Sequence, residues 1–185
     1  MSSKGMAVAL LVGMLAIGAA VVMAHEKVAI LDDCDPTDLN WAPIGGCALV
    51  EGDVNVAEFN ALLSSPLAKA VIGHPAWRFD PAYLKIEPDK TVRVTNKGGR
   101  GHTFTEVAEF GGGRVPNQDN RGQLNFGLTR APECPLQPPA DPNNLPPGAS
   151  VKVKLGVGNH RFQCCIHPWM RMLIKVLPDE PEEED

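Results

Sequence analysis

The sequence predicts an all-β protein, and two observations support this fold class. Apolar and polar side chains alternate in several short segments of the second half of the chain, as they do in strands with one buried face. The chain also has 18 Gly and 17 Pro among its 185 residues, and many of them lie between these segments. Short strands separated by Gly and Pro turns are typical of a β-sandwich. We therefore expect a sandwich with a short helical and disulfide-looped N-terminal extension.

The chain begins with a segment typical of an export signal. Lys4 is followed by an apolar run over residues 6–22, and the small residues up to Ala24 form a plausible cleavage site. We expect residues 1–24 to be removed as a signal peptide. The alternative is an uncleaved membrane anchor, because the apolar run is near the minimum length for a bilayer span. Cleavage makes the protein periplasmic or secreted, an uncleaved segment makes it membrane-anchored, and in both cases the rest of the chain lies outside the cytoplasm.

Charge narrows the range of partners. The chain has 17 Lys and Arg against 22 Asp and Glu, a net charge of −5. This acidic balance argues against nucleic acid as a partner. It suits an exported protein, expected to be a monomer, that docks transiently to other proteins. Residues 179–185 form an acidic tail, which we expect to be a solvated end of the chain.

Residues 25–76 are predicted to form the N-terminal extension. Cys34 and Cys47 flank a turn-rich stretch, which favours a disulfide that closes a small loop. Asn55 is a good N-cap residue for a following helix, and residues 53–72 have the spacing of one or two short helices. We expect these helices to pack on the main domain.

Residues 77–178 are predicted to form the main domain, with a long Pro-rich loop over residues 108–149. A segment of this length without regular signals is unusual inside a compact domain, so we interpret it as a decorated loop. The expected strands are those whose side chains alternate, around residues 84–86, 92–94, 102–107, 151–155, 160–164 and 173–177.

Near the end of the domain, a thiol, an imidazole and a thioether follow one another at intervals of three residues. They belong to Cys164, His167 and Met170. Two His and one Cys in a plane, with a weak axial Met, are the ligands of mononuclear electron-transfer copper. The second histidine must come from elsewhere, and His102 is the best candidate, since it shares strand parity with the apolar Phe104.

Strand parity separates the two adjacent cysteines. Cys164 shares a face with the apolar Phe162 and therefore points into the core, where a metal is shielded from water. Cys165 points to the other face and is free to pair with Cys134. With Cys34–Cys47 as the second disulfide, one of five cysteines remains as a thiolate. A spare thiol on an exported protein needs protection, which coordination to a metal provides.

Two methionines compete for the axial position. Counting along the last strand favours Met170, because Ile174 and Val176 then continue its face into the core. The same count from Met172 reaches Pro178, where the strand has ended. Met172 is therefore the weaker candidate.

These motifs resemble those of the cupredoxins, the small blue copper proteins, and most closely the plastocyanin- and amicyanin-like members. The likeness covers about residues 77–178. The Cys-x-x-His-x-x-Met spacing of residues 164–170 is similar to a short amicyanin ligand loop, and residues 81–96 followed by His102 resemble the first ligand region. The chain departs from the family pattern in three ways: it has Met172 in place of the usual Gly, a long Pro-rich loop between His102 and Cys164, and an N-terminal extension.

The resemblance implies a Greek-key sandwich with one copper near one end. It also implies that the edge of His167 is the electron port and that Pro168 and Trp169 form an apolar rim for transient docking of redox partners. Trp169 has a second possible role, which is simply to pack.

The sequence therefore predicts an exported type 1 copper protein that carries single electrons, with His102, Cys164, His167 and Met170 as ligands. No open coordination position is expected, which argues against an enzyme. The main alternative is a copper carrier or storage protein that uses the same ligands. An enzyme that chelates copper at a mature N-terminal His25 and a Cys-His zinc site fit the sequence poorly.

Overall fold

The computed structural model describes residues 26–44, 46–47, 49, 52–64, 72, 77–114, 128–135 and 142–179. The predicted signal peptide, nearly all of the acidic tail and the middle of the Pro-rich loop lie outside these residues. Within the described part of the chain, no helix is both long and apolar enough to cross a membrane.

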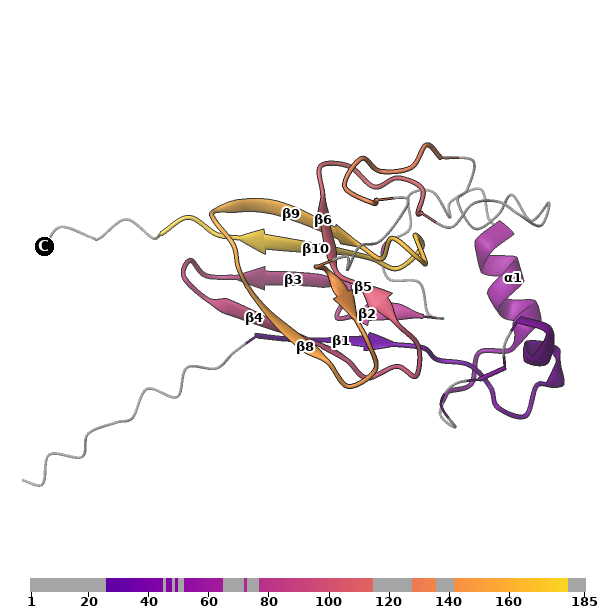
Figure 1. The fold of residues 1–185 in the computed structure, drawn as a ribbon. Coiled ribbons are helices and arrows are strands. Elements are labelled where there is room, and N and C mark those ends of the chain that lie inside the picture. The colour runs from indigo at the N-terminus through magenta and orange to yellow at the C-terminus, as the bar shows by residue number, and fades with distance from the viewer. Residues whose placement is uncertain are drawn as a thin grey trace, which may run out of the picture.

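Two four-stranded sheets face each other and confirm the predicted all-β sandwich (Figure 1). The first sheet has the order β2-β1-β4-β8, with β1 at Glu26–Leu31, β2 at Arg78–Asp80, β4 at Thr91–Asn96 and β8 at Ser150–Lys154. The second has the order β3-β10-β9-β6, with β3 at Tyr83–Ile86, β10 at Arg171–Val176, β9 at Gly158–Gln163 and β6 at Thr105–Val107. A small third sheet pairs β5, His102–Thr103, with β7, Asn144–Leu145.

Alternating side chains from both sheets fill the space between them. Val92 and Val94 of β4 are fully buried, as is Ile174 of β10. Aromatic rings link the two layers, since Phe79 of β2 packs edge-on against Phe104 at 5.3 Å between ring centroids, and Phe104 stacks on Phe162 of β9 at 4.1 Å. This packing sets the positions of the loops that leave the strands at one end.

The boundary expected at residue 77 needs a correction. The sequence pattern assigns residues 26–31 to the extension, but they form β1, which pairs in parallel with β4 and antiparallel with β2. Val28 and Ile30 of β1 are 2% and 0% exposed and belong to the main core. The strand is hard to recognise from sequence because its parallel partner lies more than sixty residues away.

The described part of the extension contains two short helices, one of which lies inside the range 53–72 predicted to be helical, whereas residues 65–71 of that range lie outside the described residues. A 3-10 helix, η1, spans Leu39–Ile44, and an α-helix, α1, spans Val56–Ser64. Asn55 is the N-cap of α1, because its side-chain oxygen accepts a hydrogen bond from the backbone N–H of Glu58 at 2.8 Å. The Cys34–Cys47 disulfide is present.

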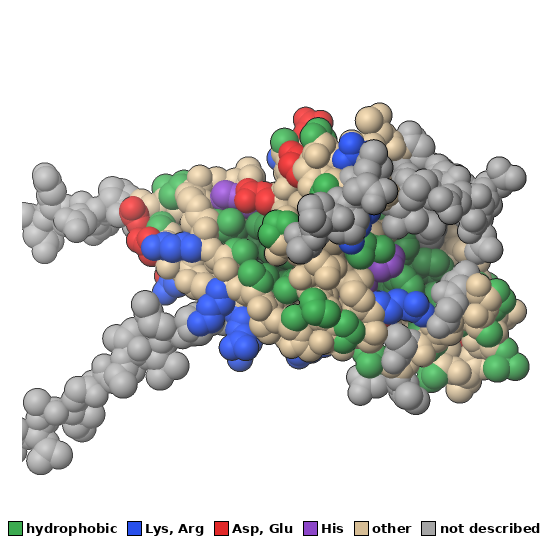
Figure 2. All heavy atoms as spheres, in the orientation of Figure 1, with side chains coloured by type: hydrophobic (Ala, Val, Ile, Leu, Met, Phe, Trp, Pro, Cys, Tyr) green, Lys and Arg blue, Asp and Glu red, His purple; other side chains and the backbone are tan. Residues whose placement is uncertain are grey.

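Helix α1 lies at one end of the sandwich (Figure 1). Phe59 on this helix contacts Trp41 of η1 at 5.2 Å between ring centroids, Trp77 at 6.0 Å and Trp169 at 5.6 Å. The extension therefore covers one end of the sandwich with aromatic side chains. At the opposite end of the sandwich, by contrast, many Lys and Arg side chains lie on the surface (Figure 2).

Candidate metal centre

Three potential metal ligands come from two distant segments of the chain and meet at the end of the sandwich near α1. His102 begins β5, Cys164 follows the last residue of β9, and His167 lies in the loop between β9 and β10. Nδ1 of His102 is 3.1 Å from Nδ1 of His167. Sγ of Cys164 is 3.8 Å from the first nitrogen and 3.6 Å from the second. The three residues predicted from sequence are therefore brought together.

These separations fit one metal ion. Metal–nitrogen bonds of about 2.0 Å and metal–sulfur bonds of about 2.3 Å, spread at about 120°, separate two nitrogens by about 3.5 Å and nitrogen from sulfur by about 3.7 Å. The observed distances of 3.1, 3.6 and 3.8 Å are close to these values. A cation between the two facing ring nitrogens would also stabilise them, because it would bind the lone pairs of both. The donor set therefore matches a three-coordinate plane.

The ligand loop is closed by its own backbone. The N–H of Cys164 donates to the carbonyl of Met170 at 3.0 Å, and the N–H of Met170 donates to the carbonyl of His167 at 2.9 Å. Met170 is fully buried. Two hydrogen bonds over seven residues hold the three side chains at a fixed spacing.

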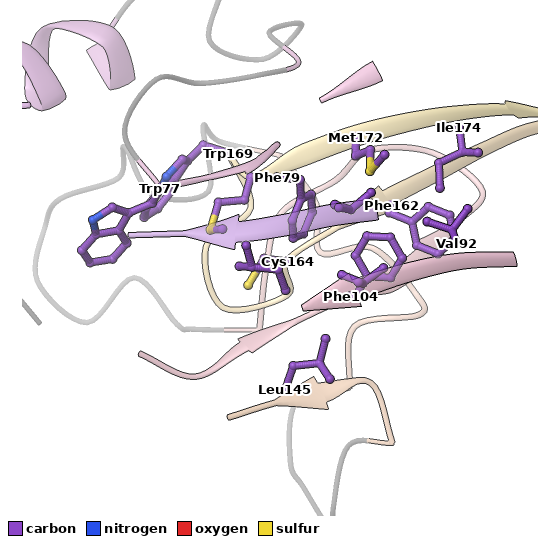
Figure 3. Close-up of a cluster of buried hydrophobic side chains, with 14 of the residues drawn as sticks. Trp77, Phe79, Val92, Phe104, Leu145, Phe162, Cys164, Trp169, Met172 and Ile174 are labelled. Carbon is purple, nitrogen blue, oxygen red and sulfur yellow. The ribbon is translucent and has the colours of Figure 1, made fainter. Parts of the chain in front are cut away.

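Met172 occupies a different position from Met170. It lies in β10, pairs with Phe162 of β9 and is fully buried. Figure 3 shows its side chain beside Ile174 and away from Cys164. Residues 170 and 172 have the same strand parity, so the sequence count could not by itself separate them. Met170 lies in the loop between β9 and β10 and Met172 lies in β10, and both side chains belong to the main core.

The Cys164 thiol has polar neighbours although it belongs to the apolar core. Cys164 is fully buried, and the backbone N–H of Thr103 donates to its sulfur at 3.3 Å. Burial alone would raise the pKa of this thiol, but hydrogen bonds with His102 and His167 hold the pKa well below its usual range. A thiolate is the form that binds a metal.

His102 has a second partner on its other side. Its Nε2 atom is hydrogen-bonded to the carboxylate of Asp32, which follows β1 directly. Burial disfavours the charged imidazolium, but Asp32 and Cys164 outweigh it and raise the pKa of His102 to about 9. Burial likewise opposes ionisation of Asp32, yet the hydrogen bonds from His102 and from the Arg100 N–H lower its pKa.

Sequence reasoning missed Asp32. Nothing in the local pattern distinguishes it from its neighbour Asp33, and both follow a segment that the pattern assigns to the extension. Recognising β1 as a sandwich strand would have indicated that the residue after it lies at the end of the sandwich that holds the ligands.

The disulfides leave one thiol free. Cys134 and Cys165 are bonded, as are Cys34 and Cys47, and all five cysteines lie in the described residues. Cys164 is the free one. Cys165 packs with Cys134 in a small second cluster, whereas Cys164 belongs to the main core. The two adjacent cysteines therefore face opposite sides of the strand, as parity requires.

The prediction that Pro168 and Trp169 form an apolar docking rim is wrong about their exposure, because both residues are buried. Trp169 is only 4% exposed. Phe59 of α1 meets its ring edge-on, and Trp77 packs against the same ring at 6.0 Å between ring centroids. Trp169 therefore takes the second role that the sequence allowed, which is packing. His167 is half-buried, and the edge of its ring contacts Trp77 at 4.9 Å between centroids.

Comparison with known proteins gives structural likenesses alone, because no family model and no curated sequence matches the chain. A purple cupredoxin from Nitrosopumilus maritimus is 17% identical with a TM-score of 0.38, and the match covers 82% of this chain and 98% of that one. An oxidised mutant of amicyanin is 12% identical with a TM-score of 0.38, over 85% of this chain and 87% of that one.

A copper-containing nitrite reductase from Thermus scotoductus is 20% identical with a TM-score of 0.34, over 56% of this chain and 21% of that one. At these identities and TM-scores, the chain's own residues must carry any functional conclusion. The first of these neighbours is by name a cupredoxin, the family that the C-terminal motif of this chain resembles.

Proposed function

We propose that the chain is a type 1 copper protein that carries single electrons between redox partners. His102, Cys164, His167 and Met170 would hold the metal, with two imidazole nitrogens, one thiolate and one thioether as donors. The observation that carries this proposal is the convergence of two imidazole nitrogens and one buried thiol from two segments far apart in the chain. One copper per chain is expected.

The chemistry of the donors favours copper. Thiolate and thioether sulfur are soft ligands, and two imidazoles with one thiolate match copper better than zinc, for which a Met ligand is unusual. Copper supplies a one-electron couple when bound. A fixed ligand loop then limits rearrangement between the oxidised and reduced states, because backbone hydrogen bonds and a neighbouring disulfide constrain it.

We propose electron transfer rather than catalysis. With four donors from the chain, no coordination position is left for a substrate. The likeness to nitrite reductase covers only 21% of that enzyme and gives no support for a shared activity. Electrons are proposed to pass at His167, the partly exposed ligand, and through the adjoining ring of Trp77.

The visible spectrum tests the metal and its ligand together. Copper(II) added to the mature chain should produce an intense thiolate band toward the red end, which disappears on reduction and in Cys164→Ser. The matched control is a Cys134→Ser, Cys165→Ser double variant, which keeps the Cys164 thiol and should keep the band. A colourless complex, with the same metal content in Cys164→Ser as in the wild type, contradicts the proposal.

A copper carrier or storage protein would use the same ligands but exchange the metal readily. Cys164 and His102 are both fully buried, which favours slow exchange. We therefore expect the reduced protein to lose copper to a competing Cu(I) chelator over hours rather than seconds. Rapid loss at low chelator concentration would favour the carrier function instead.

We propose that the protein is periplasmic or secreted and works as a monomer with transient redox partners. The two disulfides support this location, because such bonds persist in oxidising compartments. The N-terminal sequence of the protein purified from a periplasmic fraction tests both the location and the cleavage after Ala24. Cytoplasmic protein with an intact residue 1–24 segment would contradict it.

A further inference from the structure

A buried carboxylate lies behind one of the proposed ligands. Asp32 is 1% exposed, His102 is fully buried, and the two side chains are hydrogen-bonded through Nε2 of the ring. We infer that Asp32 is a positioning residue that fixes the ring of His102 and lowers the reduction potential of the copper site. This inference rests on the proposed function and adds a residue that the ligand motif does not contain.

The site is built to hold this carboxylate. Its second oxygen accepts a hydrogen bond from the backbone N–H of Arg100 at 2.7 Å. A side chain at Gly98 would meet the carboxylate, since a Cβ built there lies 2.5 Å from its carbon. The strand before Asp32 is anchored between β2 and β4. Backbone on both sides therefore fixes the place of the acid, and Gly98 leaves room for it.

The hydrogen bond determines which nitrogen faces the metal. With its proton on Nε2 and directed at Asp32, the ring presents the lone pair of Nδ1 toward Cys164 and His167. An anionic partner behind a ligand ring makes that ring more basic. Copper(II) gains more from a basic, negatively polarised ligand than copper(I) does, because it carries one more positive charge.

Because Asp32 is buried, solvent does not screen the interaction of its charge with His102 and the metal site. Charges in a water-excluded site interact far more strongly than charges at the surface. The neighbouring acid Asp33 differs in this respect, because it is partly exposed and its carboxylate pairs with Arg78. Asp33 therefore provides a matched control for the loss of one negative charge at the same turn.

The test compares the copper-loaded full mature chain with Asp32→Asn and Asp33→Asn by redox titration and by visible spectroscopy. The amide introduced by Asp32→Asn keeps one acceptor for the ring but removes the charge. We expect this variant to retain the thiolate band and to lower the ratio of copper(II) to copper(I) affinity at least tenfold. This corresponds to a rise of about 59 mV for a one-electron couple. Asp33→Asn should move the potential by less than a third of that.

A second measurement needs no variant. In proton NMR of the copper(I) protein, the Nε2 proton of His102 should appear far downfield and exchange slowly, because it is buried against an anion. An unchanged potential in Asp32→Asn with its band intact, or a rapidly exchanging Nε2 proton, overturns the role of Asp32 and leaves the proposed function standing. Absence of the band in the wild type overturns both.

Discussion

Removal of the Cys134–Cys165 disulfide is the perturbation whose magnitude follows most directly from the structure. The bond closes a sequence separation of 31 residues and ties the Pro-rich loop to the residue next to Cys164. The chain-entropy model gives a stabilisation of about 3.7 kcal/mol for a loop of this length. Cys34–Cys47 closes a separation of 13, for which the same model gives about 2.9 kcal/mol.

The assay is denaturant unfolding of the metal-free protein. A Cys134→Ala, Cys165→Ala double variant should lose about 4 kcal/mol of unfolding free energy. At about 2–4 °C per kcal/mol for a domain of this size, its Tm should fall by roughly 10 °C. Cys34→Ala, Cys47→Ala is the comparison and should lose slightly less.

The copper site should respond in a different way. The sulfur of Cys165 contacts Thr105 of β6 and lies with Cys134 in a cluster separate from the main core that holds Cys164, so its loss should not shift the thiolate band of the loaded protein. A loss of unfolding free energy below about 1 kcal/mol would refute the loop-closure reasoning. A shifted band would refute the separation of the two cysteines into different environments.

Three further outcomes are expected. Met170→Leu should change the reduction potential more than Met172→Leu, measured by redox titration, because Met170 lies in the ligand loop and Met172 in the core beside Ile174. The pKa of His102 is raised to about 9, so below that pH the metal must displace a proton from the ring in order to bind. Copper affinity should therefore rise about tenfold per pH unit up to about pH 9 and then stay constant. Competition titrations at a series of pH values measure this dependence. Gly98→Ala should reduce unfolding free energy by about 1–3 kcal/mol in denaturant titrations, because its Cβ has no room.

Each of these outcomes has a contrary result. A larger potential shift in Met172→Leu would reverse the axial assignment. A pH-independent affinity between about pH 6 and 9 would mean that His102 carries no proton in the metal-free protein. Gly156 has nothing within 4 Å of a built Cβ, so Gly156→Ala is the control for the glycine substitution. Equal losses in the two alanine variants would contradict the steric explanation.

Much of the site could be predicted from sequence because its residues lie on short strands and one loop. Cys164, His167 and Met170 are spaced by a turn that the chain forms locally, so their order indicates a shared centre. Parity distinguishes Cys164 from Cys165 because alternate residues of a strand face opposite sides. Parity could not decide between Met170 and Met172 as the fourth ligand, because two residues that are two positions apart in a strand face the same side.

The covered surface at His167 could not be predicted in this way. Whether Trp169 is exposed depends on Phe59 and Trp77, which approach it from the extension through packing rather than through chain proximity. A sequence pattern reports which side of a strand a residue faces, but not which distant segment covers that side.

The amino-acid sequence by itself determined the fold class and the one unpaired thiol and predicted the donor set, because alternation, spacing and cysteine count act over a few residues. The tertiary structure alone decided that β1 belongs to the sandwich, that Asp32 stands behind His102, and that aromatic side chains cover the ligand loop. These features depend on contacts between segments far apart in the chain. The buried Asp32 and the partly exposed Asp33 have the same local sequence pattern, so the sequence does not tell them apart.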